Sequence, residues 1–411
     1  MIYSIKRPKN IIEGSVKLPS SKSISNRLLI MSALSGKKLK ARGLSDSDDT
    51  ITMIDNLKSG DKLKNVGHAG TAMRFLTSYY SYLPGEVIIT GSERMKNRPI
   101  GELVDNLRKL GADITYTGKK NYPPLLIKGG TLKGGSLTVD GGISSQFISS
   151  LLMIAPLLPK GLEIKLTGNI ISASYINLTL QLMKRAGIKY CWKRNLIRVE
   201  EGNYQAGTIA VEPDWSAASY WYEIAALTNE SDIFLPGLTS DSLQGDSALV
   251  QIYENLGIKS GFEAKGLRLL KTPFVPSYFE FDFTLNPDLV QTLVTTCIIM
   301  EIPFRFTGTQ SLRIKETDRI LALHNEMKKF GVRIDYTDSG EWISWNGKSK
   351  FKQSHNEIIE TYDDHRMAMA FAPIALKTGE IRISDPLVVT KSYPSFWEDL
   401  LSKGFKVNQI T

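Results

Sequence analysis

The stretch GSVKLPSSKSISNRLLIMSALSG, Gly14 to Gly36, contains a short strand-like segment, a polar loop, an apolar helix and a terminating glycine. The same order recurs at residues 66–85, 136–161, 208–227, 279–301 and 358–379. The loop before each apolar helix is polar or rich in glycine: PSSKS, GHAG, GGISSQ, PDWSA, NPD and YDDHR. Any α/β protein alternates strands and helices, but six similar helix starts favour a true repeat.

The repeat predicts an α/β (α+β) fold of two lobes with three units each. The break falls near Val211, and the opening strand is expected to pair with the second half of the chain. This predicts a discontinuous C-terminal lobe of residues 1–20 plus 212–411, and an N-terminal lobe of residues 21–211. Two chain crossings between lobes suggest a hinge and a cleft. Helix N-termini that meet in one region would attract anions there.

Composition narrows the class of protein. The chain has 411 residues, with 51 Lys and Arg against 42 Asp and Glu, for a net charge of +9. Such a balance favours anionic partners. The basic residues are dispersed among Gly/Ser/Thr-rich turns, a pattern that suits small anions better than nucleic acid. No signal-peptide core or apolar run of about 18 residues is present, so we expect a cytoplasmic protein without membrane contact.

The few cysteines and histidines argue against a disulfide framework or a zinc site. Cys191 and Cys297 lie far apart without a CxxC motif, and the chain has only four histidines. The sequence therefore predicts no metal centre.

Several loops carry cations at helix starts. Lys22 and Arg27 stand at the beginning of an apolar helix, where positive charge opposes the helix dipole and favours an anionic ligand. Arg98 lies in a cluster of cations just before a proline that suits a first helical turn. Ordinary alternatives stay open, because Ser23 and Asp288 are also typical N-caps and exposed cations are commonly solvated.

Two loops in the second half combine both signs of charge. The segment IKETDR, residues 314–319, follows a strand and a turn, and YDDHR, residues 362–366, precedes an apolar helix. Charges of both signs before a buried helix are unusual for a solvated surface. These loops are candidates for a site where a substrate is bound and changed.

Seven ordered motifs resemble one family. PSSKSISNR, GHAGTAMR, RMKNRPIGELV, SSQF, IKETDRI, YDDHRMAMAF and VTKSYPSFWEDL are spread from end to end, and together they are similar to the 5-enolpyruvylshikimate-3-phosphate synthases. The resemblance implies two lobes of three βαβαββ repeats each, an inside-out α/β barrel with the active site in the cleft between lobes. This agrees with the repeat read from the residues.

The resemblance also implies a reaction. The enolpyruvyl group of phosphoenolpyruvate would be transferred to the 5-hydroxyl of shikimate 3-phosphate by addition and elimination, releasing phosphate, in the shikimate pathway to chorismate and aromatic amino acids. The two small-molecule substrates would be the partners. No cofactor or metal is implied, and a monomer is expected.

Site residues follow by match to the family's motifs. The resemblance assigns catalysis to Asp288, Glu316 and Lys22. It assigns shikimate 3-phosphate binding to Lys22, Ser23, Arg27, Ser144, Ser145, Gln146, Ser172, Tyr175, Asp288 and Lys315. It assigns phosphoenolpyruvate binding to Lys22, Gly70, Arg98, Gln146, Arg319, Arg366 and Lys391. His365 and Ser311 are further candidates, whereas Asp318 is expected to be structural.

The sequence departs from the family pattern in four places. His68 and Ser311 stand where the family usually has Asn, and Trp215 stands where small residues are usual, so we expect it to pack at the lobe junction. The segment NLKSGDKLKNVGHAG, residues 56–70, is short, which predicts that the second repeat has lost a strand pair.

Rival functions are less consistent with these residues. Enolpyruvyl transferases that act on a UDP-amino sugar typically have a reactive cysteine near the RMKNRP region, but Cys191 and Cys297 lie elsewhere. A catalytically silent binding protein would not need Lys22, Asp288 and Glu316 together. A nucleic-acid binder would need a basic stripe with interleaved aromatic residues, which is not seen.

Overall fold

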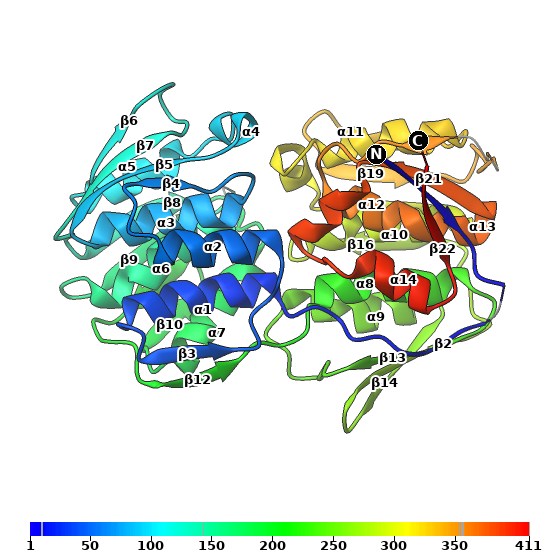
Figure 1. The fold of residues 1–411 in the computed structure, drawn as a ribbon, viewed down its shortest axis with the longest axis horizontal. Helices are drawn as coiled ribbons and strands as arrows, with labels where there is room; N and C mark the ends of the chain where they lie inside the picture. The colour runs from blue at the N-terminus through cyan, green and yellow to red at the C-terminus, as the bar shows by residue number, and fades with distance from the viewer. Residues whose placement is uncertain (10, 143, 353, 355–356, 411) are drawn as a thin grey trace. The chain divides into compact units, whose positions relative to one another are not determined.

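The computed structural model describes residues 1–9, 11–142, 144–352, 354 and 357–410. Contacts divide the chain into two compact units (Figure 1). We call Met1–Pro19 together with Glu212–Thr411 the terminal unit, and Ser20–Val211 the inserted unit. Each unit combines helices with three small sheets among the described residues, which confirms the predicted α/β class.

The inserted unit contains seven of the helices assigned to the described residues. They are α1 (Lys22–Leu34), α2 (Asp48–Lys58), α3 (Gly70–Tyr82), α4 (Glu93–Lys96), α5 (Gly101–Lys109), α6 (Ser145–Ile154) and α7 (Ala173–Arg185). Its strands are β3 (Leu39–Arg42), β4 (Leu63–Asn65), β5 (Gly85–Thr90), β6 (Asp113–Tyr116), β7 (Leu125–Gly129), β8 (Gly135–Asp140), β9 (Leu162–Thr167), β10 (Tyr190–Lys193), β11 (Leu196–Val199) and β12 (Gly207–Ala210).

The terminal unit has the same kinds of element. Its helices are α8 (Trp215–Leu227), α9 (Leu249–Glu254), α10 (Val290–Ile299), α11 (Arg319–Lys329), α12 (His365–Phe371), α13 (Ala375–Thr378) and α14 (Phe396–Ser402). Its strands are β1 (Ile2–Lys6), β2 (Ile12–Ser15), β13 (Ser231–Pro236), β14 (Ile258–Glu263), β15 (Gly266–Lys271), β16 (Phe279–Asp282), β17 (Phe304–Thr307), β18 (Asp335–Tyr336), β19 (Trp342–Trp345), β20 (Ile358–Ile359), β21 (Glu380–Ser384) and β22 (Lys406–Ile410).

One strand order recurs in the sheets. In β4-β5-β7-β6, β8-β9-β11-β10 and β16-β17-β19-β18, a parallel pair formed across a helix is extended by an antiparallel hairpin. The chain start supplies the missing members in the terminal unit. There β2 opens the sheet β2-β13-β15-β14, and β1 pairs between β21 and β22. These matching orders are the structural form of the predicted repeat.

The remaining sheet, in which β3 pairs in parallel with β12, has two strands among the described residues. In the described part of the chain, no strand pair lies between α2 and β4, before the glycine loop, as predicted. Its assignment to the second repeat is corrected, because the sheet β4-β5-β7-β6 of that repeat has four strands. The loss falls on the repeat of α1 and α2. Only residues 59–62 separate α2 from β4, a connection too short to form a hairpin.

Apolar helices form the interior of each unit. In α3, α6, α8, α10 and α12 nearly every residue is buried, and the sheets lie outside them. A helix that is covered on all sides has no face turned to solvent, and here the buried faces include polar residues such as Arg74 and Glu223. Helix α3 packs on α6 in the inserted unit, and α10 packs on α8 and α12 in the terminal unit.

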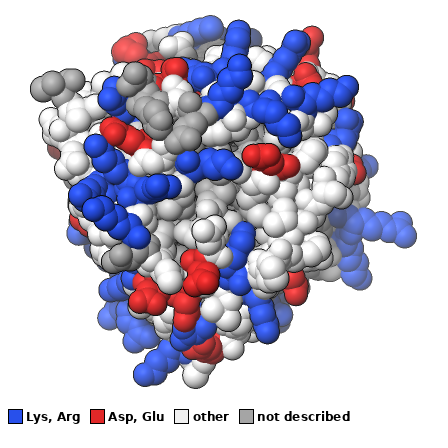
Figure 2. Space-filling model, turned by 90° about the vertical axis from the view of Figure 1, so that its right-hand side faces the viewer, with Lys and Arg blue, Asp and Glu red and all other residues white. Residues whose placement is uncertain are grey.

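Charges on the surface are mixed. Figure 2 shows one face of the terminal unit, where Lys and Arg side chains are separated by acidic and uncharged ones. A continuous basic stripe for a nucleic-acid backbone is therefore not a feature of this face. No helix among the described residues is both long and apolar enough to cross a membrane.

Candidate active site

Arg319 lies at the centre of a buried charge cluster in the terminal unit. It is the first residue of α11 and is 1% exposed. Its Nη1 lies 2.9 Å from Asp288 Oδ1, its Nη2 2.9 Å from Glu316 Oε2, and its Nε 2.7 Å from Asp364 Oδ2. Burial lowers the pKa of the guanidinium, but the three carboxylates outweigh it, so the net change is upward.

Three other cations lie close to two of these carboxylates, Asp288 and Glu316. Arg366 Nη2 lies 3.2 Å from Asp288 Oδ2, and Lys315 Nζ lies 3.6 Å from Asp288 Oδ1. Lys391 Nζ lies 3.2 Å from Glu316 Oε1. Asp288 and Glu316 have side chains that are 16% exposed, so they face a partly open region. An anion that entered here would meet four cations already gathered around two carboxylates.

The charged residues of the IKETDR segment have two kinds of environment. Asp318 caps α11 by accepting from the Leu321 N–H at 3.1 Å, and its carboxylate lies 2.7 Å from Arg313 Nη1. This is a structural role, as predicted. Lys315, Glu316 and Arg319 turn toward the cluster instead.

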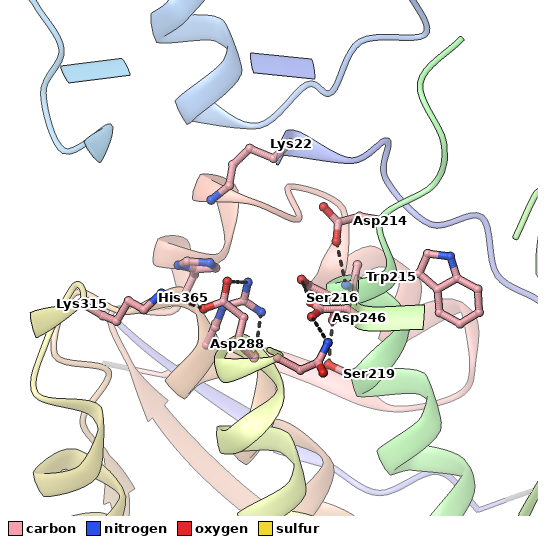
Figure 3. Close-up of polar contacts among 12 residues, drawn as sticks. Lys22, Asp214, Trp215, Ser216, Ser219, Asp246, Asp288, Lys315 and His365 are labelled. Carbon is pink, nitrogen blue, oxygen red and sulfur yellow. Dashed lines mark hydrogen bonds and ion pairs between the residues drawn. The ribbon is translucent and has the colours of Figure 1, made fainter. Parts of the chain in front are cut away.

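A second buried carboxylate, which sequence reasoning missed, lies beside this cluster. Asp246, in the turn of residues 245–248, accepts from Ser216 Oγ at 2.5 Å and from Asn286 Nδ2 at 3.4 Å (Figure 3). Burial, followed by the nearby charge of Asp288, raises the pKa of Asp246 to about 6. The side chain is 4% exposed. An acid in the loop QGDS has no local pattern that would mark it, because its partners come from distant helices.

Replacing Asp246 with asparagine should change how stability depends on pH. A carboxyl whose pKa rises from 3.8 to about 6 on folding stabilises the fold below pH 4, and this contribution is lost as pH rises through 6. Between pH 4 and pH 7, wild type should lose on the order of 3 kcal/mol relative to Asp246→Asn. Urea unfolding at both pH values measures this difference. Equal changes in the two proteins would contradict it.

In the inserted unit, Lys22 and Arg27 have different environments. Lys22 opens α1, and its Nζ lies 3.4 Å from Asp49 Oδ2. Arg27 is 2% exposed and donates to Thr179 Oγ1 at 2.7 Å, to Ser149 Oγ at 3.2 Å and to the Ser23 carbonyl at 2.9 Å. Burial lowers the pKa of Arg27 to about 10, against a smaller opposing effect of Tyr175.

Through these hydrogen bonds Arg27 links three helices. Its Nη2 also donates to the Tyr175 carbonyl at 3.3 Å, so one guanidinium joins the start of α1 to α6 and α7. The expectation that Arg27 holds a substrate stays a prediction. Its hydrogen bonds already fix the backbone at Ser23 and Tyr175, two further predicted binding residues.

Gly70 lies directly against two guanidinium groups. A Cβ added at this position would lie 2.5 Å from Arg98 Nη1 and 2.7 Å from Arg74 Nη1. Arg74 Nη1 donates to the Gly70 carbonyl at 2.8 Å. Glycine therefore allows two cations to approach the N-terminus of α3, an arrangement suited to an anion. Arg74 is an additional candidate that the site prediction did not include.

The remaining predicted residues of the inserted unit lie at other helix starts. Ser144 and Ser172 occupy the N-cap positions of α6 and α7 without a side-chain capping hydrogen bond. Ser145 begins α6, and Gln146 donates from Nε2 to Thr71 Oγ1 at 3.2 Å, which links α6 to the start of α3. Helix starts of the inserted unit are thus joined by their polar side chains.

Four further residues stand out in the sequence, two as additional site candidates and two as departures from the family pattern, and each has a different environment. His365 is buried, with Nδ1 3.7 Å from Asp364 Oδ1, and buried Ser311 Oγ makes no hydrogen bond with the described residues. His68 Nδ1 lies 3.1 Å from Ser92 Oγ. Trp215 is fully buried, and its ring centroid lies 6.5 Å from that of Phe262 within the terminal unit.

Comparisons with known proteins identify the family. The family model described as EPSP synthase (3-phosphoshikimate 1-carboxyvinyltransferase) matches residues 6–60 and 54–400. A 3-phosphoshikimate 1-carboxyvinyltransferase of Bacteroides fragilis (strain ATCC 25285) is 49% identical over 409 residues, covering 99% of each chain. A protein of the same name from Marinomonas sp. (strain MWYL1) is 34% identical over 430 residues, covering 95% of this chain and 97% of its own.

A solved structure shares the fold. An EPSP synthase from Acinetobacter baumannii superimposes with a TM-score of 0.77 at 23% identity, with all of both chains covered. The two-lobed α/β fold expected from the repeat is thereby confirmed. With its sequence matched over nearly its whole length, this chain belongs to the EPSP synthase family.

Proposed function

We propose that this protein transfers the enolpyruvyl group of phosphoenolpyruvate to the 5-hydroxyl of shikimate 3-phosphate and releases phosphate. The product would serve the shikimate pathway to chorismate and the aromatic amino acids. One observation supports this most strongly: four cations converge on Asp288 and Glu316. Anion binding and proton transfer, both of which the reaction needs, can thus occur in one place.

Both substrates carry a carboxylate and a phosphate, and we propose that the basic loops bind these anionic groups. Guanidinium groups grip such anions through paired hydrogen bonds. For phosphoenolpyruvate we assign Lys22, Gly70, Arg98, Gln146, Arg319, Arg366 and Lys391. For shikimate 3-phosphate we assign Lys22, Ser23, Arg27, Ser144, Ser145, Gln146, Ser172, Tyr175, Asp288 and Lys315, with His365 and Ser311 as further candidates.

The chemistry divides into two balanced steps. In the addition, the 5-hydroxyl attacks C2 of phosphoenolpyruvate and loses its proton to Asp288, while C3 gains a proton and becomes a methyl group. In the elimination, the methyl group loses a proton and the C2–O bond to phosphate breaks. We assign the methyl-group transfers to Glu316 and Lys22. The surrounding cations stabilise phosphate as it leaves.

Replacing Gly70 with alanine should weaken phosphoenolpyruvate binding selectively. The new Cβ would overlap with Arg98 and Arg74 at the ends of their flexible side chains, so the guanidinium groups would move while the fold persists. Loss of one charge-assisted hydrogen bond should raise KM for phosphoenolpyruvate about 10- to 100-fold. Steady-state kinetics measures this change.

Gly60→Ala is the matched control. Apart from its neighbours in sequence, no heavy atom of the described residues lies within 4 Å of a Cβ at Gly60, so the KM values of Gly60→Ala should match those of wild type. Equal KM values for phosphoenolpyruvate in Gly70→Ala and Gly60→Ala would refute the assignment of Gly70.

Turnover should require both substrates. Phosphate release is expected when the purified protein is incubated with phosphoenolpyruvate and shikimate 3-phosphate, and not when either is omitted. Release with a UDP-amino sugar in place of shikimate 3-phosphate would instead support the rival transferase activity.

The proposal also concerns the lobes of the enzyme, its oligomeric state and its location in the cell. The terminal and inserted units would be the C-terminal and N-terminal lobes of the enzyme, with residues of both serving one reaction. The protein would act as a monomer in the cytoplasm. Size-exclusion chromatography with light scattering should give the mass of one 411-residue chain.

A further inference from the structure

Asp364 contacts both arginines of the terminal-unit cluster. It is 0% exposed, with Oδ2 2.7 Å from Arg319 Nε and Oδ1 3.4 Å from Arg319 Nη2. The same Oδ1 accepts the backbone N–H of Arg366 at 2.9 Å, which caps α12. One buried carboxylate therefore holds a side chain of α11 and the first turn of α12.

We infer that Asp364 is a positioning residue that sets the orientation of Arg319 and the location of Arg366 for anion binding. A guanidinium is planar and presents its donors in fixed directions. Because Asp364 occupies Nε of Arg319, the two Nη groups are directed toward Asp288 and Glu316. Those Nη groups are the donors that an incoming carboxylate or phosphate would meet.

The backbone before Asp364 is in an unusual conformation. Tyr362 and Asp363 have φ angles of 53° and 54°, in the left-handed region that residues other than glycine seldom adopt. Two such residues in succession need support from their surroundings. The turn is closed by a hydrogen bond from the Asp364 N–H to the Thr361 carbonyl at 2.8 Å.

Glu326 on α11 supplies that support. It is 0% exposed and accepts from the Tyr362 hydroxyl at 2.7 Å and from the Glu360 N–H at 3.1 Å. Helix α11 therefore contacts residues 360–364 at two points, through Glu326 and through Arg319. The strained turn is held against the helix whose first residue is Arg319, and this fixes where Asp364 lies.

Positioning and simple structural support have different consequences. A carboxylate that only stabilised the fold would, on removal, lower the unfolding midpoint and leave substrate affinity unchanged. A positioning residue would weaken anion binding by the correctly folded protein. The inference rests on the proposed function, because it takes phosphoenolpyruvate to be the anion that Arg319 and Arg366 bind.

The test compares Asp364→Asn with wild type. Asparagine retains an oxygen that can accept from the Arg366 N–H, but it removes the charge that holds Arg319. Loss of a hydrogen bond between charged groups should raise KM for phosphoenolpyruvate about 10- to 100-fold, while KM for shikimate 3-phosphate stays within about threefold. An unchanged KM for phosphoenolpyruvate would overturn the inference.

Two further variants separate positioning from folding. Tyr362→Phe removes the hydroxyl that donates to Glu326 and should raise the same KM a few-fold. Leu269→Ala, at a fully buried position of β15, should lower the unfolding midpoint and leave both KM values unchanged at temperatures where it is folded. If Leu269→Ala raised KM for phosphoenolpyruvate as much as Asp364→Asn did, the effect would be one of stability and the inference would fail.

Calorimetric titration with inorganic phosphate gives a readout that does not depend on turnover. Weaker phosphate binding by Asp364→Asn than by wild type supports the positioning role, even if wild type shows no transferase activity and the proposed function fails. Equal phosphate affinity, or none in wild type, overturns the positioning role.

Discussion

In the Arg319→Met variant, the free energy of unfolding should fall by about 3–5 kcal/mol. Arg319 is 1% exposed and is the shared partner of Asp288, Glu316 and Asp364. Methionine fills a similar volume but leaves three carboxylates without their common cation, and Asp364 is wholly buried. Breaking one side of a buried ion pair is costly because the remaining charge cannot return to water.

Denaturant unfolding measures this loss, and Arg268→Met is its matched control. Arg268 also pairs with two carboxylates, at 2.6 Å from Asp232 and 2.5 Å from Glu263, but its side chain is 37% exposed on a sheet surface. Exposed ion pairs contribute little, so the midpoint should hardly move. If the two methionine variants unfolded at the same denaturant concentration, the buried cluster would not have the importance assigned to it.

The second large effect is expected in turnover. Asp288→Asn should lower kcat by about 10²- to 10⁴-fold, because a general base typically contributes that much. KM should change little. Asp288 carries negative charge beside the cations that bind substrate anions. Neutralising it leaves Arg319 and Arg366 free to bind those anions, and an amide can replace the carboxylate in its contact with the substrate. Steady-state kinetics with each substrate varied separately checks both parts.

Glu316→Gln tests the other proposed acid in the same assay. Its Oε atoms lie between Arg319 and Lys391, and a similar fall in kcat is expected. Near-normal turnover in both Asp288→Asn and Glu316→Gln would refute the division of proton transfers. A rise in KM without a fall in kcat would show that these residues bind substrate rather than move protons.

The repeat could be predicted from the sequence because its signal is local. A polar loop followed by a helix apolar on all sides lies within about 20 residues, and burial of α8, α10 and α12 follows from composition alone. The structural role of Asp318 could also be predicted, because an N-cap residue lies next to the helix that it caps. The short connection before the glycine loop could be read from the sequence, but the repeat that lost the strand pair could not, because strand pairing depends on partners such as β12 that are distant along the chain.

Much of the candidate site's detail could not be predicted, for the same physical reason. Asp364 and Arg319 are 45 residues apart, and Asp246 and Ser216 are 30 residues apart. No local spacing brings such pairs together, since their contact depends on how helices pack. The family motifs suggested roles for Asp288, Glu316 and Arg319, whereas the structure shows that Arg319 contacts both carboxylates.

The central claim is the transfer of an enolpyruvyl group, and product analysis tests it most directly. Purified protein would be incubated with phosphoenolpyruvate and shikimate 3-phosphate, and the quenched mixture examined by phosphorus NMR and mass spectrometry. We predict equal amounts of inorganic phosphate and of shikimate 3-phosphate enlarged by one enolpyruvyl group, with both formed about 10²- to 10⁴-fold more slowly by Asp288→Asn. Unchanged substrates, or phosphate without the enolpyruvyl product, would contradict the account.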